Sequence, residues 1–134
     1  INENDFELLD FFTPNETEAE FYYNKKIETN EDIKSASKEF LNRGVKNIII
    51  TLGERGVYFA NKNEEYFVDA LKLKNEVVDT TGAGDAFNGA FAVALANKLK
   101  YKDALIFANK VAGISTTRLG AAISMPTLKE VDNY

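Results

Sequence analysis

The residues best suited to chemistry lie in one short run between an apolar stretch and a long helical pattern. This run is Gly82, Ala83, Gly84 and Asp85. Glycines adopt backbone angles closed to other residues, so the N–H groups at the start of a helix can point at one anion. A carboxylate beside such a site suits phosphoryl transfer to an alcohol, because it can take the hydroxyl proton. A glycine turn with an acidic residue at a helix start remains an equal alternative.

The amino-acid composition excludes several classes of catalytic and binding site. The 134 residues include no histidine and no cysteine, which excludes imidazole bases, thiolate nucleophiles and cysteine zinc sites. The 16 basic and 21 acidic residues give a formal charge of −5, which argues against a nucleic-acid surface. No apolar run predicts a membrane span and the first residues do not resemble a signal peptide, so the expected location is the cytoplasm. With 45% hydrophobic residues, one domain with its own core is expected.

Other glycine-rich nucleotide sites fit this run less well. A Rossmann turn would need a glycine where this chain has Phe87. A Walker A loop needs Gly-Lys-Ser or Gly-Lys-Thr, and neither occurs. A dinucleotide-binding oxidoreductase is therefore only a distant alternative.

The surrounding pattern predicts an α/β chain. Strands are predicted at residues 6–12, 46–52, 57–60 and 65–68, with turns at 53–56 and 61–63. Helices are predicted at residues 16–24, 31–43, 86–99 and 102–117, and from residue 127; residues 77–78 lead into the glycine run and residues 118–122 are irregular. Asn30 is expected to cap the 31–43 helix and Gly44 to end it. The helix-to-strand order favours parallel strands, and the closely spaced strands favour a β-meander.

Four stretches of the chain, in order, resemble the ribokinase-like (PfkB) carbohydrate kinases. Residues 78–90 are similar to the C-terminal signature of that family, and the other three stretches are residues 13–20, 50–56 and 116–121. The resemblance covers nearly the whole chain. It implies the C-terminal portion of a three-layer α/β/α fold, with a largely parallel sheet and a β-meander.

The resemblance also implies roles for two groups of residues. Asp85 would be the catalytic base, and the N–H groups of Gly82, Ala83 and Gly84 would form the anion hole. Asn15 and Glu18 match an element that organises magnesium, through its waters, near the phosphates. The spacing of this pair also fits a capping box at a helix start, which is compatible with a magnesium role.

Further positions match nucleotide and cation contacts. The implied nucleotide contacts are Thr51, Gly53, Gly56 and Asn109, the last beside the adenine. A tight hairpin turn and a solvated helix position are the alternatives for these residues. A monovalent cation, expected to be potassium, is implied at Asp79, Thr81, Ser115, Arg118, Gly120 and Ser124. Irregular loops also offer such oxygen ligands by default.

The activity implied is phosphorylation of a sugar hydroxyl by ATP with magnesium. The form of residues 13–18 favours ribose, followed by fructose or a related sugar, and the expected partners are this sugar and ATP. Complete family members are longer and begin with a sugar-binding portion and a lid. Residues 1–134 are therefore expected to be the nucleotide-binding and catalytic C-terminal portion, inactive alone, of a protein that can form homodimers. A nucleotide-binding module without turnover and a structural or regulatory relic remain alternatives.

Overall fold

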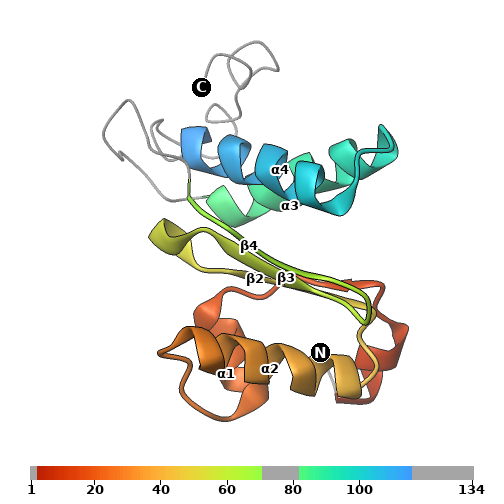
Figure 1. The fold of residues 1–134 in the computed structure, drawn as a ribbon, viewed down its shortest axis with the longest axis vertical. Helices are drawn as coiled ribbons and strands as arrows, with labels where there is room; N and C mark the ends of the chain where they lie inside the picture. The colour runs from red at the N-terminus through yellow and green to blue at the C-terminus, as the bar shows by residue number, and fades with distance from the viewer. Residues whose placement is uncertain (1–2, 71–81, 116–134) are drawn as a thin grey trace. The chain divides into compact units, whose positions relative to one another are not determined.

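The computed structural model describes residues 3–70 and 82–115, and Figure 1 shows their course. The chain divides into two units, Ile1–Phe67 and Val68–Tyr134. The first unit runs in the order η1 (Glu3–Leu8), β1 (Phe11–Phe12), α1 (Glu16–Tyr23), α2 (Asn30–Asn42), β2 (Asn47–Thr51), η2 (Gly53–Arg55), β3 (Val57–Ala60) and β4 (Glu65–Val68), where η marks a 3₁₀ helix. The second unit contains α3 (Ala83–Ala96) and α4 (Tyr101–Ser115). None of the described helices is long and apolar enough to cross a membrane.

The sheet of the first unit is mixed. Its strand order is β1-β2-β3-β4. Strands β1 and β2 are parallel, with Phe12 opposite Ile48, and β2 and β3 are antiparallel, with Ile49 opposite Phe59. Helices α1 and α2 lie together on one face of this sheet (Figure 1). The pair of strands linked through helices is parallel, as predicted, and the meander from β2 to β4 is confirmed.

Aromatic rings fill the core between this sheet and its two helices. The ring of Phe12 lies 5.2 Å from that of Phe6 and 5.2 Å from that of Phe40, measured between centroids, in edge contacts. Ile48 and Ile50 of β2 belong to the same buried cluster. Because Phe12 and these isoleucines are fixed by packing, the ends of β1 and β2 are held at defined positions.

Helix α2 confirms the predicted amphipathic segment, but its cap is one residue earlier than predicted. The Oγ1 atom of Thr29 accepts a hydrogen bond from the Asp32 amide at 3.1 Å, and Asp32 Oδ2 accepts one from the Thr29 amide at 3.0 Å. A capping box needs a polar acceptor three residues after the cap. Thr29 has Asp32 at that position, whereas Asn30 has Ile33, so the prediction of Asn30 as the cap was wrong.

The strand predicted at residues 6–12 was wrong over its first part. A 3₁₀ helix covers Glu3–Leu8, and only Phe11–Phe12 pair with β2. The Leu9 amide donates to the Phe6 carbonyl at 3.2 Å, Phe6 is fully buried, and Leu8 is 81% exposed. Side chains three residues apart share one side of a 3₁₀ helix. The nearly continuous apolar sequence concealed this three-residue period.

In the described part of the second unit, helices α3 and α4 pack against each other. Helix α3 buries alanines and phenylalanines: Ala86, Phe87, Ala90, Phe91 and Ala94. Helix α4 buries the small residues Ala104 and Ala108, which allow α3 and α4 to approach closely. Helix α3 begins at Ala83, three residues before the predicted start, so its first turn includes Gly84 and Asp85. The segments predicted at residues 77–78, at 118–122 and from 127 onward lie outside the described residues.

Candidate functional site

Two stretches that resemble the family, residues 13–20 and 50–56, lie next to each other because they lie at the carboxyl ends of the paired strands β1 and β2. After β1 ends, Asn15 still pairs with Thr51 in a parallel bridge. The Thr51 amide donates to the Pro14 carbonyl at 3.0 Å. In α/β proteins, ligands bind where the loops that follow neighbouring parallel strands meet. The segment before α1 and the turn after β2 therefore form the candidate site of the first unit.

Asn15 and Glu18 form a complete capping box at the start of α1. Asn15 Oδ1 accepts from the Glu18 amide at 2.8 Å, and Glu18 Oε1 accepts from the Asn15 amide at 3.0 Å. Both residues are exposed, and Glu18 Oε2 accepts no hydrogen bond from the described part of the chain. The structure therefore confirms the capping box that the spacing of Asn15 and Glu18 allowed. A carboxylate oxygen remains available, which suits a cation that keeps its waters and needs few protein ligands.

The turn after β2 contains Gly53 and Gly56. Their φ angles are +58° and +93°. The Leu52 amide donates to the Gly56 carbonyl at 2.8 Å, and the Gly56 amide donates to the Gly53 carbonyl at 3.1 Å. The predicted tight turn between two strands is thus confirmed. It exposes Gly53 and Glu54 beyond the end of β2.

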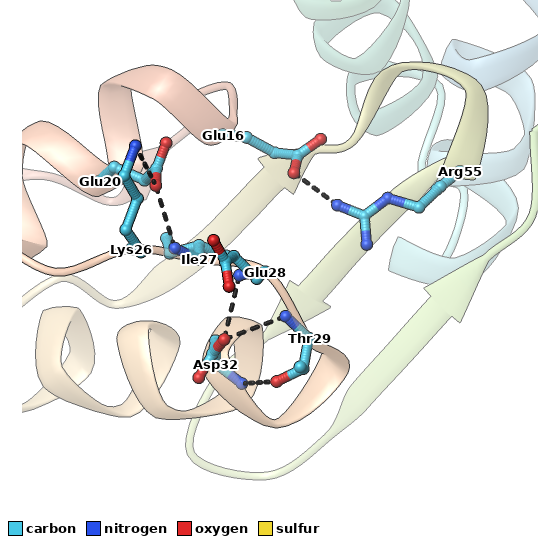
Figure 2. Close-up of polar contacts among 8 residues, drawn as sticks. All are labelled: Glu16, Glu20, Lys26, Ile27, Glu28, Thr29, Asp32 and Arg55. Carbon is cyan, nitrogen blue, oxygen red and sulfur yellow. Dashed lines mark hydrogen bonds and ion pairs between the residues drawn. The ribbon is translucent and has the colours of Figure 1, made fainter.

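An ion pair between Glu16 and Arg55 joins these two segments, and no pattern in the sequence predicts it. Arg55 is the last residue of η2, Glu16 is the first of α1, and a guanidinium nitrogen of Arg55 donates to Glu16 Oε2 (Figure 2). The two residues are 39 apart in the sequence. Glu16 lies within the stretch 13–20 and Arg55 within the stretch 50–56, and membership of these two stretches is the only signal for the pair in the sequence.

A second set of contacts in Figure 2 fixes the far end of α1. Glu20 Oε2 accepts from the Ile27 amide at 3.0 Å, and the Lys26 ammonium lies 3.9 Å from the same oxygen. Ile27 is buried in the core. Helix α1 is therefore held at both ends, which gives its N-terminus a defined place at the strand edge.

In the second unit, Gly82, Ala83, Gly84 and Asp85 lie at the start of α3. Gly82 is the N-cap, with a φ of +79°, and it has no side chain that could cap the first N–H groups. A Cβ atom added to Gly84 would meet nothing within 4 Å, so packing of the described chain does not require glycine there. Asp85 is exposed in the first turn. Uncapped N–H groups at a helix start attract an anion.

The remaining predicted residues have different outcomes. Asn109 on α4 is not simply a solvated helix position, because its Nδ2 donates to the Asp69 carbonyl at 2.8 Å. Ser115 ends α4; it is buried, and its Oγ donates to the Ala112 carbonyl at 2.7 Å. The other positions of the predicted cation site lie outside the described residues: Asp79, Thr81, Arg118, Gly120 and Ser124. Within residues 3–70 and 82–115, no group of three or more acidic side chains gathers as a metal site.

The mixed sheet with α1 and α2 packed on one face places the chain among α/β proteins. Residues 4–128 match the pfkB family of carbohydrate kinases, and the chain belongs to that family. A ribokinase of Staphylococcus aureus is 41% identical over 127 residues, which are 93% of this chain and 41% of that protein.

Two solved structures are similar to this chain. One is a ribokinase from Thermotoga maritima, with 44% identity and a TM-score of 0.88, matched over 99% of this chain and 44% of that one. The other is an Arabidopsis thaliana ribokinase complexed with ribose and ATP, with 34% identity and a TM-score of 0.93, matched over 99% of this chain and 43% of that one. The α/β class and the ribokinase-like fold are therefore confirmed. The chain spans about two fifths of the length of these proteins.

Proposed function

We propose that this protein transfers the γ-phosphoryl group of ATP to a sugar hydroxyl, with ribose as the first candidate and fructose or a related sugar as the next. The observation that carries the proposal is the start of α3, where exposed Asp85 follows two glycines in an uncapped first turn. Similarity to a ribokinase complexed with ribose and ATP supports the choice of substrates.

Asp85 serves as the base in this reaction. Its carboxylate accepts the hydroxyl proton while the sugar oxygen forms a bond to the γ-phosphorus and the bond from that phosphorus to the leaving ADP oxygen breaks. The N–H groups of Gly82, Ala83 and Gly84 stabilise the negative charge on the moving phosphoryl oxygens. The products are the sugar phosphate, ADP and a proton.

The first unit supplies contacts to the nucleotide and its metal. Thr51, Gly53 and Gly56 contact the nucleotide. Asn109, which belongs to α4 of the second unit, is the residue proposed for the adenine. The oxygens of Asn15 and Glu18 fit magnesium through its waters, because a hard cation that stays hydrated needs only one or two carboxylates nearby. Bound magnesium neutralises charge on the phosphates. Potassium is proposed at Asp79, Thr81, Ser115, Arg118, Gly120 and Ser124. Of these residues the structure describes Ser115, the last residue of α4.

A coupled assay of ADP release tests this function. The complete protein is assayed with ATP, magnesium and either ribose or fructose, and the result expected is turnover that depends on the sugar. ATP hydrolysis at the same rate with and without either sugar would contradict the proposal.

We further propose that residues 1–134 provide the nucleotide site and the base, while the groups that hold the sugar lie outside them. Positioning of a reacting alcohol supplies as much as about 7–11 kcal/mol. These 134 residues assayed alone are therefore expected to show no sugar-dependent turnover, although they bind ATP weakly. A melting curve checks that they are folded, and turnover comparable to that of a complete kinase would contradict this division.

A further inference from the structure

The ion pair between Glu16 and Arg55 connects the two segments that make up the candidate site of the first unit. Glu16 follows Asn15 directly and lies in the turn of α1 that carries Glu18. Arg55 closes the η2 turn that begins at Gly53. The two side chains are partly exposed, at 32% for Glu16 and 45% for Arg55. They face each other across the strand edge (Figure 2).

The Glu16–Arg55 ion pair contributes little to the free energy of unfolding. Partly exposed ion pairs contribute about 0–1 kcal/mol, because water screens the charges and both side chains lose freedom. The turn also has its own backbone hydrogen bonds, from Leu52 to Gly56 and from Gly56 to Gly53. Helix α1 has its own capping box. Each segment is thus formed without the ion pair, and the pair adds to the backbone hydrogen bond from Thr51 to Pro14 in setting one segment relative to the other.

The pair also balances charge at this edge. Glu16 and Glu18 are both acidic residues in the first turn of α1. A phosphate chain approaching this turn would be repelled by an unpaired Glu16 carboxylate. The guanidinium of Arg55 neutralises that carboxylate and leaves Glu18 as the acidic side chain in the first turn of α1 that is available to a hydrated cation.

We infer that Arg55 and Glu16 are positioning residues that hold the Gly53–Arg55 turn against the N-terminus of α1 and thereby set the affinity for the magnesium complex of ATP. The inference rests on the proposed function. Neither residue is required to touch the reacting atoms, so the effect falls on binding rather than on the chemical step. This positioning role requires opposite charges at residues 16 and 55, whichever of the two residues carries the positive charge.

The experiment uses the complete protein and three variants: Glu16→Gln, Arg55→Gln, and a double variant in which Glu16→Arg is combined with Arg55→Glu. The control is Asp10→Asn. Asp10 Oδ1 lies 3.1 Å from Lys46 Nζ, in an exposed pair that joins the amino ends of the same two strands. Titration calorimetry with the magnesium complex of a non-hydrolysable ATP analogue gives Kd, steady-state assays give KM and kcat, and melting curves give Tm.

Each single variant is expected to raise Kd and KM for the nucleotide about fivefold, with kcat within about twofold of the wild type. Their Tm values should match that of Asp10→Asn, whose Kd stays at the wild-type value. The double variant should recover most of the lost affinity, because the opposite charges are restored in exchanged positions.

Two results would overturn the inference and leave the proposed function intact. One is a Kd in both single variants no higher than in Asp10→Asn. The other is a much larger loss in Arg55→Gln than in Glu16→Gln with no recovery in the double variant, since Arg55 would then contact the nucleotide directly. Failure of the proposed function is seen earlier, in the wild type alone. A wild type that does not bind the nucleotide overturns both, whereas one that binds it without sugar turnover overturns the function and still tests the pair through Kd.

Discussion

Helices α1 and α3 begin in opposite ways. At α1, Asn15 and Glu18 satisfy each other's backbone amides, and at α2, Thr29 and Asp32 do the same. At α3 the cap position is Gly82, which has no side chain to offer. Replacing a side-chain N-cap by alanine costs about 0.5–2 kcal/mol, but replacing it by glycine costs only a few tenths, so Gly82 leaves the start of α3 without a side-chain acceptor at little expense in stability. Within residues 3–70 and 82–115, no side chain caps the opening N–H groups of α3, whereas side chains of the fold cap those of α1 and α2.

The glycine inside the first turn of α3 extends this contrast. Glycine in a helix is less favourable than alanine by about 1 kcal/mol. A Cβ at Gly84 would meet nothing within 4 Å in the described chain, and the same holds for Gly89 further along α3. Packing therefore explains neither glycine. At Gly84, the proposed approach of a phosphate to the backbone would explain the glycine.

The largest effect is expected at Asp85. We predict that Asp85→Asn lowers kcat on the order of 10²-fold or more, because the acceptor for the hydroxyl proton is lost, while Kd for ATP changes little. Asp103→Asn is the matched control, since Asp103 is an exposed acid in the first turn of α4. Steady-state kinetics and calorimetry on both variants make the comparison. Near-normal turnover in Asp85→Asn would contradict the role of Asp85 as the base and would favour a purely structural role for the start of α3.

The next effect is expected at Gly84. We predict that Gly84→Val weakens binding of an ATP analogue about tenfold or more, because a branched Cβ blocks approach to the backbone. The Tm should stay close to that of the wild type, since the space around Gly84 is open. Gly82→Val is a poorer test, because the φ of +79° makes valine strained there.

Gly89→Val controls for the presence of valine in α3. It is expected to leave both Tm and nucleotide affinity near the wild-type values. Equal affinity in the Gly84 and Gly89 variants, both folded, would remove the distinction between the start of α3 and the rest of that helix.

A smaller effect separates the two capped helices. Asn15→Ala and Thr29→Ala should each lower the free energy of unfolding by about 1 kcal/mol, because each removes an N-cap acceptor. Only Asn15→Ala should also raise the magnesium concentration needed for half-maximal activity, since an outer contact to the hydrated ion is lost. Urea unfolding and magnesium titrations of activity measure the two quantities. Identical magnesium dependence in the two variants would make the Asn15 box a cap and nothing more.

The sequence predicts the local elements of this chain well. The β-branched residues of β2 predict a buried strand, and Ile48, Ile49 and Ile50 are all buried. The glycine run predicts the start of a helix because glycine angles and helix starts are local properties. The order of strands in the meander follows from short turns, which leave neighbouring strands little choice of partner.

The sequence does not predict contacts that depend on tertiary structure. Glu16 and Arg55 meet only because parallel pairing places the ends of β1 and β2 side by side. The use of Asn109 to hold the Asp69 carbonyl has no local signal either. The 3₁₀ helix at Glu3–Leu8 forms because Phe6 must reach the aromatic core, and propensity alone does not reveal that requirement.

The smallest effect concerns the self-capped start of α2 and its dependence on pH. Backbone N–H groups of Glu28 and Thr29, followed by the Thr29 hydroxyl, lower the pKa of Asp32 below its ordinary value. A lowered folded-state pKa means that the ionised carboxylate stabilises the fold above the unfolded pKa of about 3.9, and that this stability is lost as pH falls through the folded pKa. We predict that Asp32→Asn lowers the urea midpoint at about pH 6 and that its difference from the wild type shrinks below about pH 4. Glu31→Gln removes the same charge from the adjacent residue, which makes no capping bond in the described chain, so its difference should vary less with pH. A difference for Asp32→Asn that stays constant with pH would mean that the charge of Asp32 does not contribute to the cap, and the contribution of this side chain would then come from contacts that do not depend on its ionisation.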